Sequence, residues 1–202
     1  SYVSPSVNIH NNDTRFMSLY NAFLNSSKNS NASEDELQKL YDVLLKFSHT
    51  FALKGEPLGQ THVVEHHIDT SDNSPVFSKC FRVEHAMREK MRTIINEMLI
   101  DGVIVPSKSP WASPLFLISK KDGSLRPVVD YRRLNDVTKT QVYPLPNMED
   151  CFDAIGNAKY FSTLDLKHGF WQIPLDVNSR EKTAFTCPIG HFEFNVMPFG
   201  IK

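Results

Sequence analysis

The chain has 202 residues, 41% of them hydrophobic, which is enough for one substantial core or two small ones and indicates a globular protein. Lys and Arg total 22 against 23 for Asp and Glu, so the composition excludes an overall basic field of the kind that marks many nucleic-acid-binding proteins. No apolar run reaches the ~20 residues of a membrane span, and the N-terminus lacks the plan of a signal peptide.

The three cysteines, Cys80, Cys151 and Cys187, are an odd number at wide spacings, which gives neither a disulfide framework nor a zinc pattern. We therefore expect an intracellular protein, cytoplasmic or nuclear and not secreted, with no membrane partner. The chain begins at Ser1 without a methionine and stops at Lys202, and we expect both ends to be cut from a longer protein.

The first 32 residues are rich in Asn and Ser with scattered apolar side chains, so we predict a linker with at most one weak helical turn and disorder over much of it. Ser33 and Glu36 then form a capping-box pattern, and apolar residues follow at helical spacing. This pattern predicts a helix over about residues 33–47.

Residues 62–68 predict an edge strand. Its three histidines, His62, His66 and His67, invite a metal interpretation, but no fourth ligand lies nearby and a strand would split them between two faces. Further on, apolar residues recur at helical spacing from Glu84 to Asp101, which predicts an amphipathic helix that ends at Gly102.

Residues 114–120 and 125–131 flank a turn that contains Asp-Gly, a strong hairpin signal. Lys120, Lys121 and Arg126 would cluster at the tip of this hairpin, where Arg could bind a triphosphate bidentately and Lys as a point charge. The alternative is an ordinary solvent-facing tip. Residues 108–139 carry seven basic residues against three acids, a local excess of four. This excess could form a binding surface for nucleic acid or an ordinary solvated face.

Residues 147–156 predict a short helix, capped by an asparagine and closed by a glycine. Residues 161–166 then predict a short buried strand that carries one acid, Asp165, and a buried charge needs a partner or a metal. A tight turn at Gly169 would let backbone N–H groups approach a ligand, and an aromatic residue after it, Phe170 or Trp171, could form the floor of a pocket. Such a layout suits a metal-dependent nucleotidyl transferase, although an aspartate that only caps a turn would give the same local pattern.

The C-terminal part predicts a turn at residues 176–180 and a second hairpin. Its strands would be residues 183–188 and 191–196, and Phe192, Phe194 and Val196 alternate onto one face of the second strand.

Three stretches carry a family resemblance. Residues 102–135 are GVIVPSKSPWASPLFLISKKDGSLRPVVDYRRLN, residues 143–175 are YPLPNMEDCFDAIGNAKYFSTLDLKHGFWQIPL, and residues 182–202 are KTAFTCPIGHFEFNVMPFGIK. Together they resemble the reverse transcriptase of gypsy-type long-terminal-repeat retrotransposons, which is part of a Pol polyprotein. The resemblance covers approximately residues 84–202, and residues 51–81 match more loosely.

This resemblance implies an α+β fold, the right-hand polymerase fold, of which the chain would hold the fingers and the first part of the palm. It divides the chain into a linker or upstream segment with one helix (1–50), an approach segment (51–83) and a reverse transcriptase fragment (84–202). Within the fragment, residues 84–139 and 173–199 match the fingers and residues 140–172 part of the palm. The palm's Tyr-x-Asp-Asp hairpin, the thumb and a ribonuclease H are not in the sequence.

The resemblance also implies a catalytic site. Asp165 matches the first metal-binding aspartate of the palm, and the backbone carbonyl of Leu166 matches a ligand of the metal on the triphosphate side. The metal implied is Mg²⁺, with Mn²⁺ as the alternative. Two such ions, about 3.5–4 Å apart, serve phosphoryl-transfer sites by activating the attacking oxygen and steadying the leaving one.

The remaining implied roles concern the incoming nucleotide. Lys120, with Lys121 beside it, and Arg126 match cations of the fingers that grip the triphosphate. His168 and Gly169 match positions whose backbone N–H groups contact the phosphates, and Phe199 matches a residue that contacts the nucleotide. Phe170 matches an aromatic gate that packs under the deoxyribose, where a ribose 2′-hydroxyl would clash.

The family copies an RNA or DNA template into DNA. The implied partners are therefore an RNA/DNA template-primer, dNTPs and the rest of the Pol polyprotein (protease, ribonuclease H and integrase), in a cytoplasmic virus-like particle or in the nucleus. Asp150 and Asp153 are expected to be exposed helix acids that do not replace the missing Asp-Asp pair, so we expect the 202-residue chain alone to be inactive.

Two alternatives stay open at this point. The chain could be a non-catalytic nucleic-acid-binding or interaction module derived from a retroelement. It could also belong to a related polymerase that copies RNA into RNA, although the bulky Phe170 favours selection of deoxynucleotides.

Overall fold

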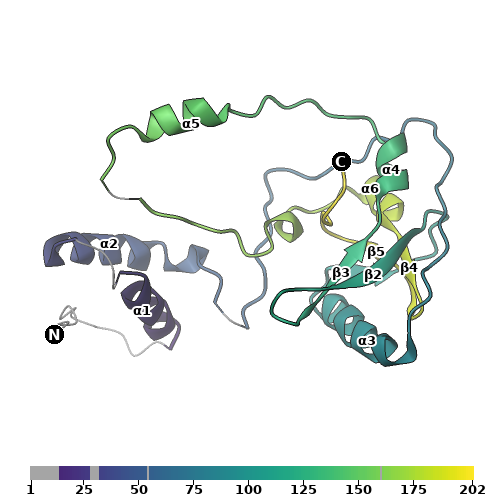
Figure 1. Ribbon diagram of the computed structural model, residues 1–202, viewed down its shortest axis with the longest axis horizontal. Helices are drawn as coiled ribbons and strands as arrows, with labels where there is room; N and C mark the ends of the chain where they lie inside the picture. The colour runs from purple at the N-terminus through teal and green to yellow at the C-terminus, as the bar shows by residue number, and fades with distance from the viewer. Residues whose placement is uncertain (1–13, 28–31, 54, 160) are drawn as a thin grey trace. The chain divides into compact units, whose positions relative to one another are not determined.

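The structure is a computed structural model that describes residues 14–27, 32–53, 55–159 and 161–202 (Figure 1). The chain forms two compact units, Ser1–Pro57 and Leu58–Lys202. Each unit has its own apolar core, so the two are described separately.

The described residues of the first unit form two helices, α1 (Thr14–Ser27) and α2 (Glu34–Lys46), followed by a single 3₁₀ turn, η1 (Ser48–Thr50). The prediction of at most one weak helical turn before residue 33 is wrong, because α1 is a helix of 14 residues. Tyr20 and Phe23 of α1 lie one helical turn apart and pack against Tyr41 of α2, with ring centroids 5.3 and 5.8 Å from the Tyr41 ring. The disorder predicted for residues 1–13 and 28–31 lies outside the described residues.

The capping box predicted at the start of α2 is confirmed. Ser33 Oγ accepts a hydrogen bond from the Glu36 backbone N–H at 3.4 Å, and the Ser33 backbone N–H donates to Glu36 Oε2 at 2.8 Å. The two residues thus satisfy donors that the first turn of a helix would otherwise leave unpaired.

The second unit is built on a mixed five-stranded sheet in the order β1-β5-β4-β2-β3. Only the β2–β4 pair is parallel, and the hairpins β2–β3 and β4–β5 are both antiparallel, so the two predicted hairpins are confirmed. The strands are β1 (Ile104–Pro106), β2 (Ser113–Ser119), β3 (Leu125–Val129), β4 (Phe185–Cys187) and β5 (Gly190–Phe194).

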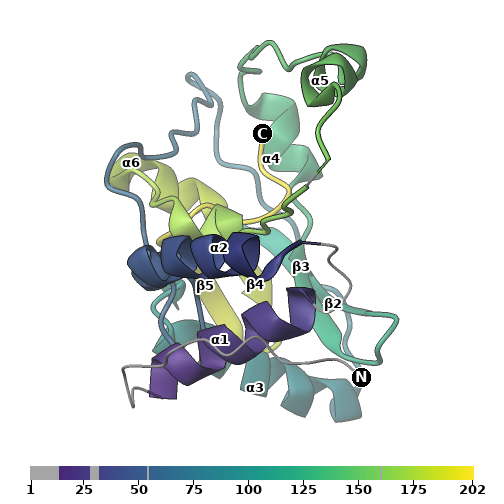
Figure 2. The ribbon, with the colours of Figure 1, turned by 90° about the vertical axis from the view of Figure 1, so that its left-hand side faces the viewer.

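Helix α3 (His85–Ile100) covers one face of this sheet (Figures 1 and 2). Its buried residues Met91, Ile95 and Met98 share one core cluster with sheet residues such as Phe185 and Phe194. The helix predicted over residues 84–101 is therefore confirmed, and its methionines Met91 and Met98 are core residues, whereas Met87 is only partly buried. Gly102 follows with φ +68°, which lets the Val103 N–H donate to the Met98 carbonyl at 3.0 Å and close the helix.

The predicted edge strand at residues 62–68 is wrong. The segment makes one isolated parallel bridge, between His66 and Leu175, and Val63 is 88% exposed. The segment and the residues after it are held to the second unit by separate contacts, such as the Lys139–Asp69 ion pair at 2.8 Å. They do not form the continuous hydrogen bonds of a paired strand. Among the described residues, no three His, Cys, Asp or Glu side chains are grouped as metal ligands.

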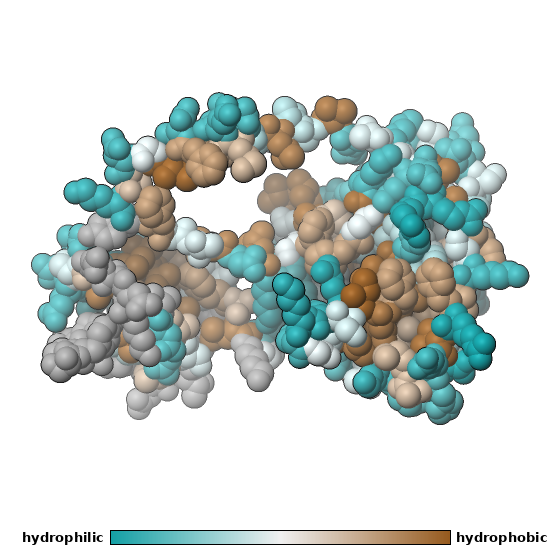
Figure 3. Space-filling model, viewed as in Figure 1, coloured by the Kyte–Doolittle hydropathy of each residue, from teal (hydrophilic) through white to brown (hydrophobic). Residues whose placement is uncertain are grey.

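Residues 140–168 hold the predicted helix, α5 (Met148–Ile155), but the buried strand predicted after it is wrong. Phe161, Leu164 and Leu166 are 68%, 82% and 73% exposed. Figure 3 shows brown, apolar side chains on the outside of this part of the chain. A strand needs a hydrogen-bonded neighbour and an apolar cover, and no segment of the described residues provides either here.

Four short helical elements complete the described part of the second unit: α4 (Arg132–Val137), the 3₁₀ turn η2 (Gly169–Gln172), α6 (Val177–Arg180) and the 3₁₀ turn η3 (Glu181–Thr183). The turn predicted at residues 176–180 is this single turn of α6, capped by Asp176. Cys80, Cys151 and Cys187 are free thiols. None of the helices in the described ranges has the length and apolar content to cross a bilayer.

Candidate functional site

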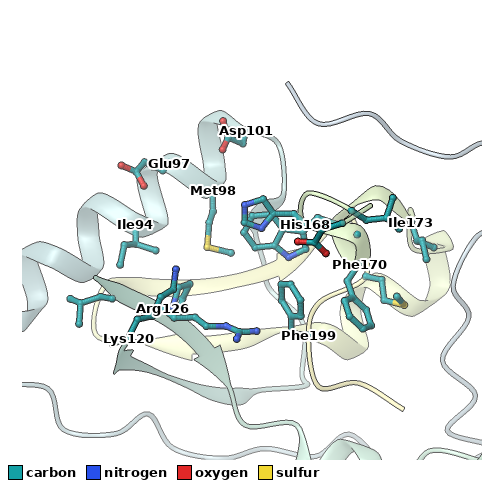
Figure 4. A pocket seen from close by; sticks show the side chains of 17 residues that line it. Ile94, Glu97, Met98, Asp101, Lys120, Arg126, His168, Phe170, Ile173 and Phe199 are labelled. Atoms are coloured by element: carbon teal, nitrogen blue, oxygen red, sulfur yellow. The ribbon is translucent and has the colours of Figure 1, made fainter. Parts of the chain in front are cut away.

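A pocket of about 860 Å³ lies in the second unit, lined by α3, the β2–β3 hairpin and the chain around residues 165–173 and 197–199 (Figure 4). Eight of the nine residues predicted to form the site line it, and Lys121 does not. The structure therefore brings together side chains that are up to about 80 positions apart in the sequence. The eight are Lys120, Arg126, Asp165, Leu166, His168, Gly169, Phe170 and Phe199.

The two pocket cations come from the β2–β3 hairpin. Lys120 follows the last residue of β2, and its backbone N–H donates to the Ser124 carbonyl at 2.8 Å. Asp122 Oδ1 accepts from the Ser124 N–H and Oγ at 2.9 and 2.7 Å, and these hydrogen bonds lower the pKa of Asp122. The turn is thus fixed by its own side chains, which holds Lys120 and Arg126 at the same end of the hairpin.

The floor of the pocket is a 3₁₀ turn, η2 (Gly169–Gln172). His168 precedes it in the left-handed region (φ +49°), and its ring stacks on Trp171 with centroids 4.8 Å apart. A Cβ on Gly169 would lie 3.2 Å from the Cβ of Leu166, so a side chain there would push against Leu166. The predicted tight turn is confirmed, and glycine allows the chain to close on itself at this point.

Aromatic rings form the wall beside this floor. The Phe199 centroid lies 5.0 Å from that of Phe170 and 6.2 Å from that of Trp171. The guanidinium carbon of Arg126 lies 4.8 Å from the Phe199 centroid, within cation–π range. Figure 4 shows Arg126 and Phe199 side by side, with Phe170 on the other side of Phe199.

Carboxylates line the pocket together with the two cations. They are Asp165, Glu97 of α3 and Asp101, the C-cap of that helix. Because the three acids outnumber the two cations, Lys120 and Arg126, the pocket would repel a free triphosphate. It would accept a triphosphate that carries a divalent cation. The charge pattern therefore suits a metal–nucleotide complex better than a bare anion.

The oxygen atoms at Asp165 are of the kind that Mg²⁺ prefers, namely its carboxylate and the backbone carbonyl of Leu166. Mg²⁺ in proteins commonly keeps several waters and is bound through one or two carboxylates plus substrate phosphates. Asp165 thus fits as one ligand of such an ion. It is not a complete metal site, since the described residues group no three potential metal-ligating side chains.

Sequence reasoning missed the contribution of α3 to the pocket. Glu97 and Asp101 are four residues apart, so they share one face of the helix beside the buried Met98. Their spacing could have predicted a common face, but it does not say that this face borders the pocket. Trp171 was also missed as a partner of the His168 ring.

Comparisons with known proteins point to one family. A family profile described as "Reverse transcriptase (RNA-dependent DNA polymerase)" matches residues 118–202, a stretch that includes all nine predicted site residues. The chain is 38% identical over 175 residues to a retrovirus-related Pol polyprotein from transposon 297 of Drosophila melanogaster. Residues 118–202 belong to the reverse transcriptase family. The match covers 84% of this chain and 16% of the transposon 297 polyprotein.

Two further proteins are similar to most of this chain. The Pol polyprotein of transposon gypsy from Drosophila melanogaster is 34% identical over 175 residues, which is 83% of this chain and 17% of that protein. The crystal structure of the prototype foamy virus protease-reverse transcriptase superposes with a TM-score of 0.79 and 26% identity, over 91% of this chain and 25% of that chain. This reverse transcriptase segment thus has the α+β polymerase fold and spans about a sixth of the length of the curated relatives that it matches.

Proposed function

We propose that this segment provides the nucleotide-binding part of an RNA-directed DNA polymerase, which extends a primer with dNTPs on an RNA or DNA template. The pocket supports this proposal, because one cavity holds a carboxylate, two cations and an aromatic floor. These are the groups needed to bind a metal–triphosphate complex and to position its sugar.

In the proposed complex, Lys120 and Arg126 bind the triphosphate of the incoming nucleotide. Arg126 would contribute a planar set of N–H donors and Lys120 a point charge. The backbone N–H groups of His168 and Gly169 lie at the start of η2 and would donate to phosphate oxygens. The ring of Phe170 would pack under the deoxyribose and exclude a 2′-hydroxyl.

Asp165 and the Leu166 carbonyl would hold Mg²⁺, with Mn²⁺ as the alternative ion. The ion would supply charge neutralisation at the phosphates as the new bond forms. The chain's own residues orient the nucleotide around it: the hairpin cations fix the phosphates, and the Phe170 and Phe199 rings fix the sugar end. Lys121 lies outside the pocket lining, so its proposed role is secondary.

The proposed partners follow from the Pol polyprotein context. A template-primer would lie beside the pocket, and the protease, ribonuclease H and integrase would be other parts of the same polyprotein. We also propose the subdivision into fingers (84–139 and 173–199) and partial palm (140–172), and a cytoplasmic virus-like particle or the nucleus as the place of action.

The test is primer extension by the intact protein that contains this segment. We expect extension of a DNA primer on an RNA template with dNTPs and Mg²⁺, and its loss in Asp165→Asn, which keeps the size of the side chain. The matched control is Asp153→Asn on α5, an exposed acid outside the pocket, which should leave extension unchanged. Extension that survives Asp165→Asn would contradict the proposal.

The 202-residue chain gives a second test. Its sequence has no Tyr-x-Asp-Asp, so we predict that it does not extend a primer by itself. Extension by the isolated chain would contradict this prediction. Binding of a template-primer by an intact protein that never extends it would instead favour a nucleic-acid-binding module, and such binding should weaken steeply with salt.

A further inference from the structure

The guanidinium of Arg126 lies on the Phe199 ring, with its carbon 4.8 Å from the ring centroid. Within the part of the chain that the structure describes, no ion pair or hydrogen bond occupies its side chain. The neighbouring Arg132 differs, because Asp130 takes its Nε–H at 2.8 Å and its Nη2–H at 2.6 Å. The ring of Phe199 is therefore the contact that holds the head of Arg126.

A ring and a carboxylate hold an arginine in different ways. A carboxylate accepts the N–H donors of the guanidinium, so these donors must be released before they bind anything else. An aromatic face attracts the cation through its π electrons and leaves the N–H edge free. Arg126 is thus positioned while its donors remain available to another anion.

Phe199 is itself held in place. Its ring lies 5.0 Å from that of Phe170, and the Met197 backbone N–H before it donates to the Ile173 carbonyl at 2.8 Å. After it, Gly200 has φ +85°, and its carbonyl accepts from Asn135 Nδ2 at 2.8 Å. The Phe199 ring is therefore held in place by hydrogen bonds of the residues before and after it in the chain.

We propose that Phe199 is a positioning residue that holds the guanidinium of Arg126 over the pocket with its N–H donors free for the phosphates of the incoming nucleotide. The inference rests on the proposed function and adds to it. Phe199 would act on nucleotide binding through Arg126, in addition to any direct contact with the nucleotide. An arginine that is already in place loses less side-chain freedom when the triphosphate binds.

The test uses the intact protein in primer extension, with the dNTP concentration varied. Phe199→Leu removes the ring face but keeps an apolar side chain against Phe170. It should raise KM for the dNTP by about 2- to 30-fold, the range that corresponds to a cation–π contact. Phe199→Tyr keeps the ring and should restore KM to within about twofold of the wild type. KM should change more than kcat, and the Kd for the template-primer should not change.

A double-mutant cycle with Arg126→Met separates positioning from packing. If Phe199 acts through Arg126, Phe199→Leu raises KM by a larger factor in the wild-type background than when Arg126→Met is already present. Equal effects in both backgrounds would overturn the inference, and so would an unchanged KM in Phe199→Leu.

Failure of the inference is distinguishable from failure of the proposed function. Extension that survives Asp165→Asn would overturn the proposed function. Extension that is lost in Asp165→Asn, together with an unchanged KM in Phe199→Leu, would overturn only the role of Phe199. An independent check is the NMR shift of the Arg126 Cδ protons, which the Phe199 ring should move upfield and Phe199→Leu should return toward the usual value. An unshifted Arg126 signal in the wild type would overturn the inference.

Discussion

His67 and Asp176 lie 109 residues apart in the sequence and are joined by a hydrogen bond of 2.8 Å between Nδ1 and Oδ2. The same carboxylate accepts from Ser179 Oγ, and Ser179 Oγ accepts from the Ile68 backbone N–H at 2.8 Å. Two backbone bonds continue the contact, from the Thr61 N–H to the Gln172 carbonyl and from the His66 N–H to the Pro174 carbonyl. Residues 61–68 thus brace the chain directly after the pocket floor.

The contacts of Asp176 in this brace predict that the free energy of unfolding depends on pH. Partial burial raises the pKa of Asp176, but hydrogen bonds from Ser179, His67 and the Asn178 N–H outweigh it and hold the pKa at about 2. A carboxyl group whose pKa is lower in the folded state stabilises the fold above its unfolded pKa of about 3.9, and this stability is lost as the pH falls toward 2. Asp176→Asn keeps the capping position and removes the charge, so it should lower the free energy of unfolding by about 1–3 kcal/mol at pH 7.

Urea unfolding of the 202-residue chain at several pH values measures this effect. The difference between wild type and Asp176→Asn should be largest above pH 4 and should shrink below it. The control is Asp72→Asn, because Asp72 is exposed and outside the brace. A difference that stays constant from pH 6 to pH 3 would show that the charge of Asp176 does not carry the stabilisation.

Tyr131 offers a test of a single buried hydrogen bond. Its hydroxyl donates to the Thr183 carbonyl at 2.7 Å, and the two residues are 2% and 0% exposed. Burial raises the pKa of Tyr131 well above its usual value of 10, so the hydroxyl stays protonated at neutral pH. Tyr131→Phe leaves the Thr183 carbonyl without this donor and should cost about 1–2 kcal/mol in urea unfolding. Tyr143→Phe, at a residue that is 80% exposed, is the matched control, and an equal loss there would contradict the prediction.

Two phenylalanines that the sequence placed in strands should behave differently in the isolated chain. Phe185 of β4 is fully buried, with its ring 5.7 Å from Phe192 and 5.3 Å from Phe194, and Phe185→Ala should cost about 3–5 kcal/mol. Phe161 is 68% exposed, and Phe161→Ala should stay within about 0.5 kcal/mol. The urea midpoints of the two variants, each compared with the wild type, test this difference. A large loss of stability in Phe161→Ala would support the buried strand that the sequence predicted.

The elements that the sequence predicted correctly are those with local signals. Ser33 and Glu36 satisfy each other within one helical turn, and the Asp-Gly turn of the first hairpin is fixed by Asp122 and Ser124. The stripe on α3 and the alternation on β5 also arise within one element. In these cases the energy that selects the structure comes from residues that are close in sequence.

The errors concern apolar residues whose burial depends on other segments. Residues 161–166 have the composition of a strand, but a strand also needs a neighbour, which the local sequence does not specify. In α1, Tyr20 and Phe23 looked scattered because their cover, Tyr41, lies in the next helix. The site itself was predicted from family motifs, but Glu97 of α3, its C-cap Asp101 and the stacking of Trp171 on His168 were missed. Amphipathicity predicts the buried face of a helix and not the pocket beside it.

Lys120 and Lys121 are adjacent in sequence, but only Lys120 lines the pocket. If the pocket binds a triphosphate, Lys120→Ala should raise KM for the dNTP by roughly tenfold, the value of one charge-assisted hydrogen bond. Lys121→Ala removes the same charge one residue away and should change KM by less than about twofold. Steady-state extension by the intact protein compares the two variants directly. Equal effects would mean that general electrostatic attraction, and not contact in the pocket, accounts for both.

Phe170 is half exposed at 46%, and its ring meets the pocket beside Phe199. A large ring at the sugar position selects by exclusion, because the cost falls on the ribose 2′-hydroxyl and not on deoxyribose. Phe170→Ala should therefore lower the ratio of kcat/KM for dCTP over CTP by about tenfold or more, mainly through improved use of CTP. Phe170→Tyr keeps the ring and should preserve the ratio. A variant that loses activity with both nucleotides equally would show that the ring supports the fold of the pocket and does not select the sugar.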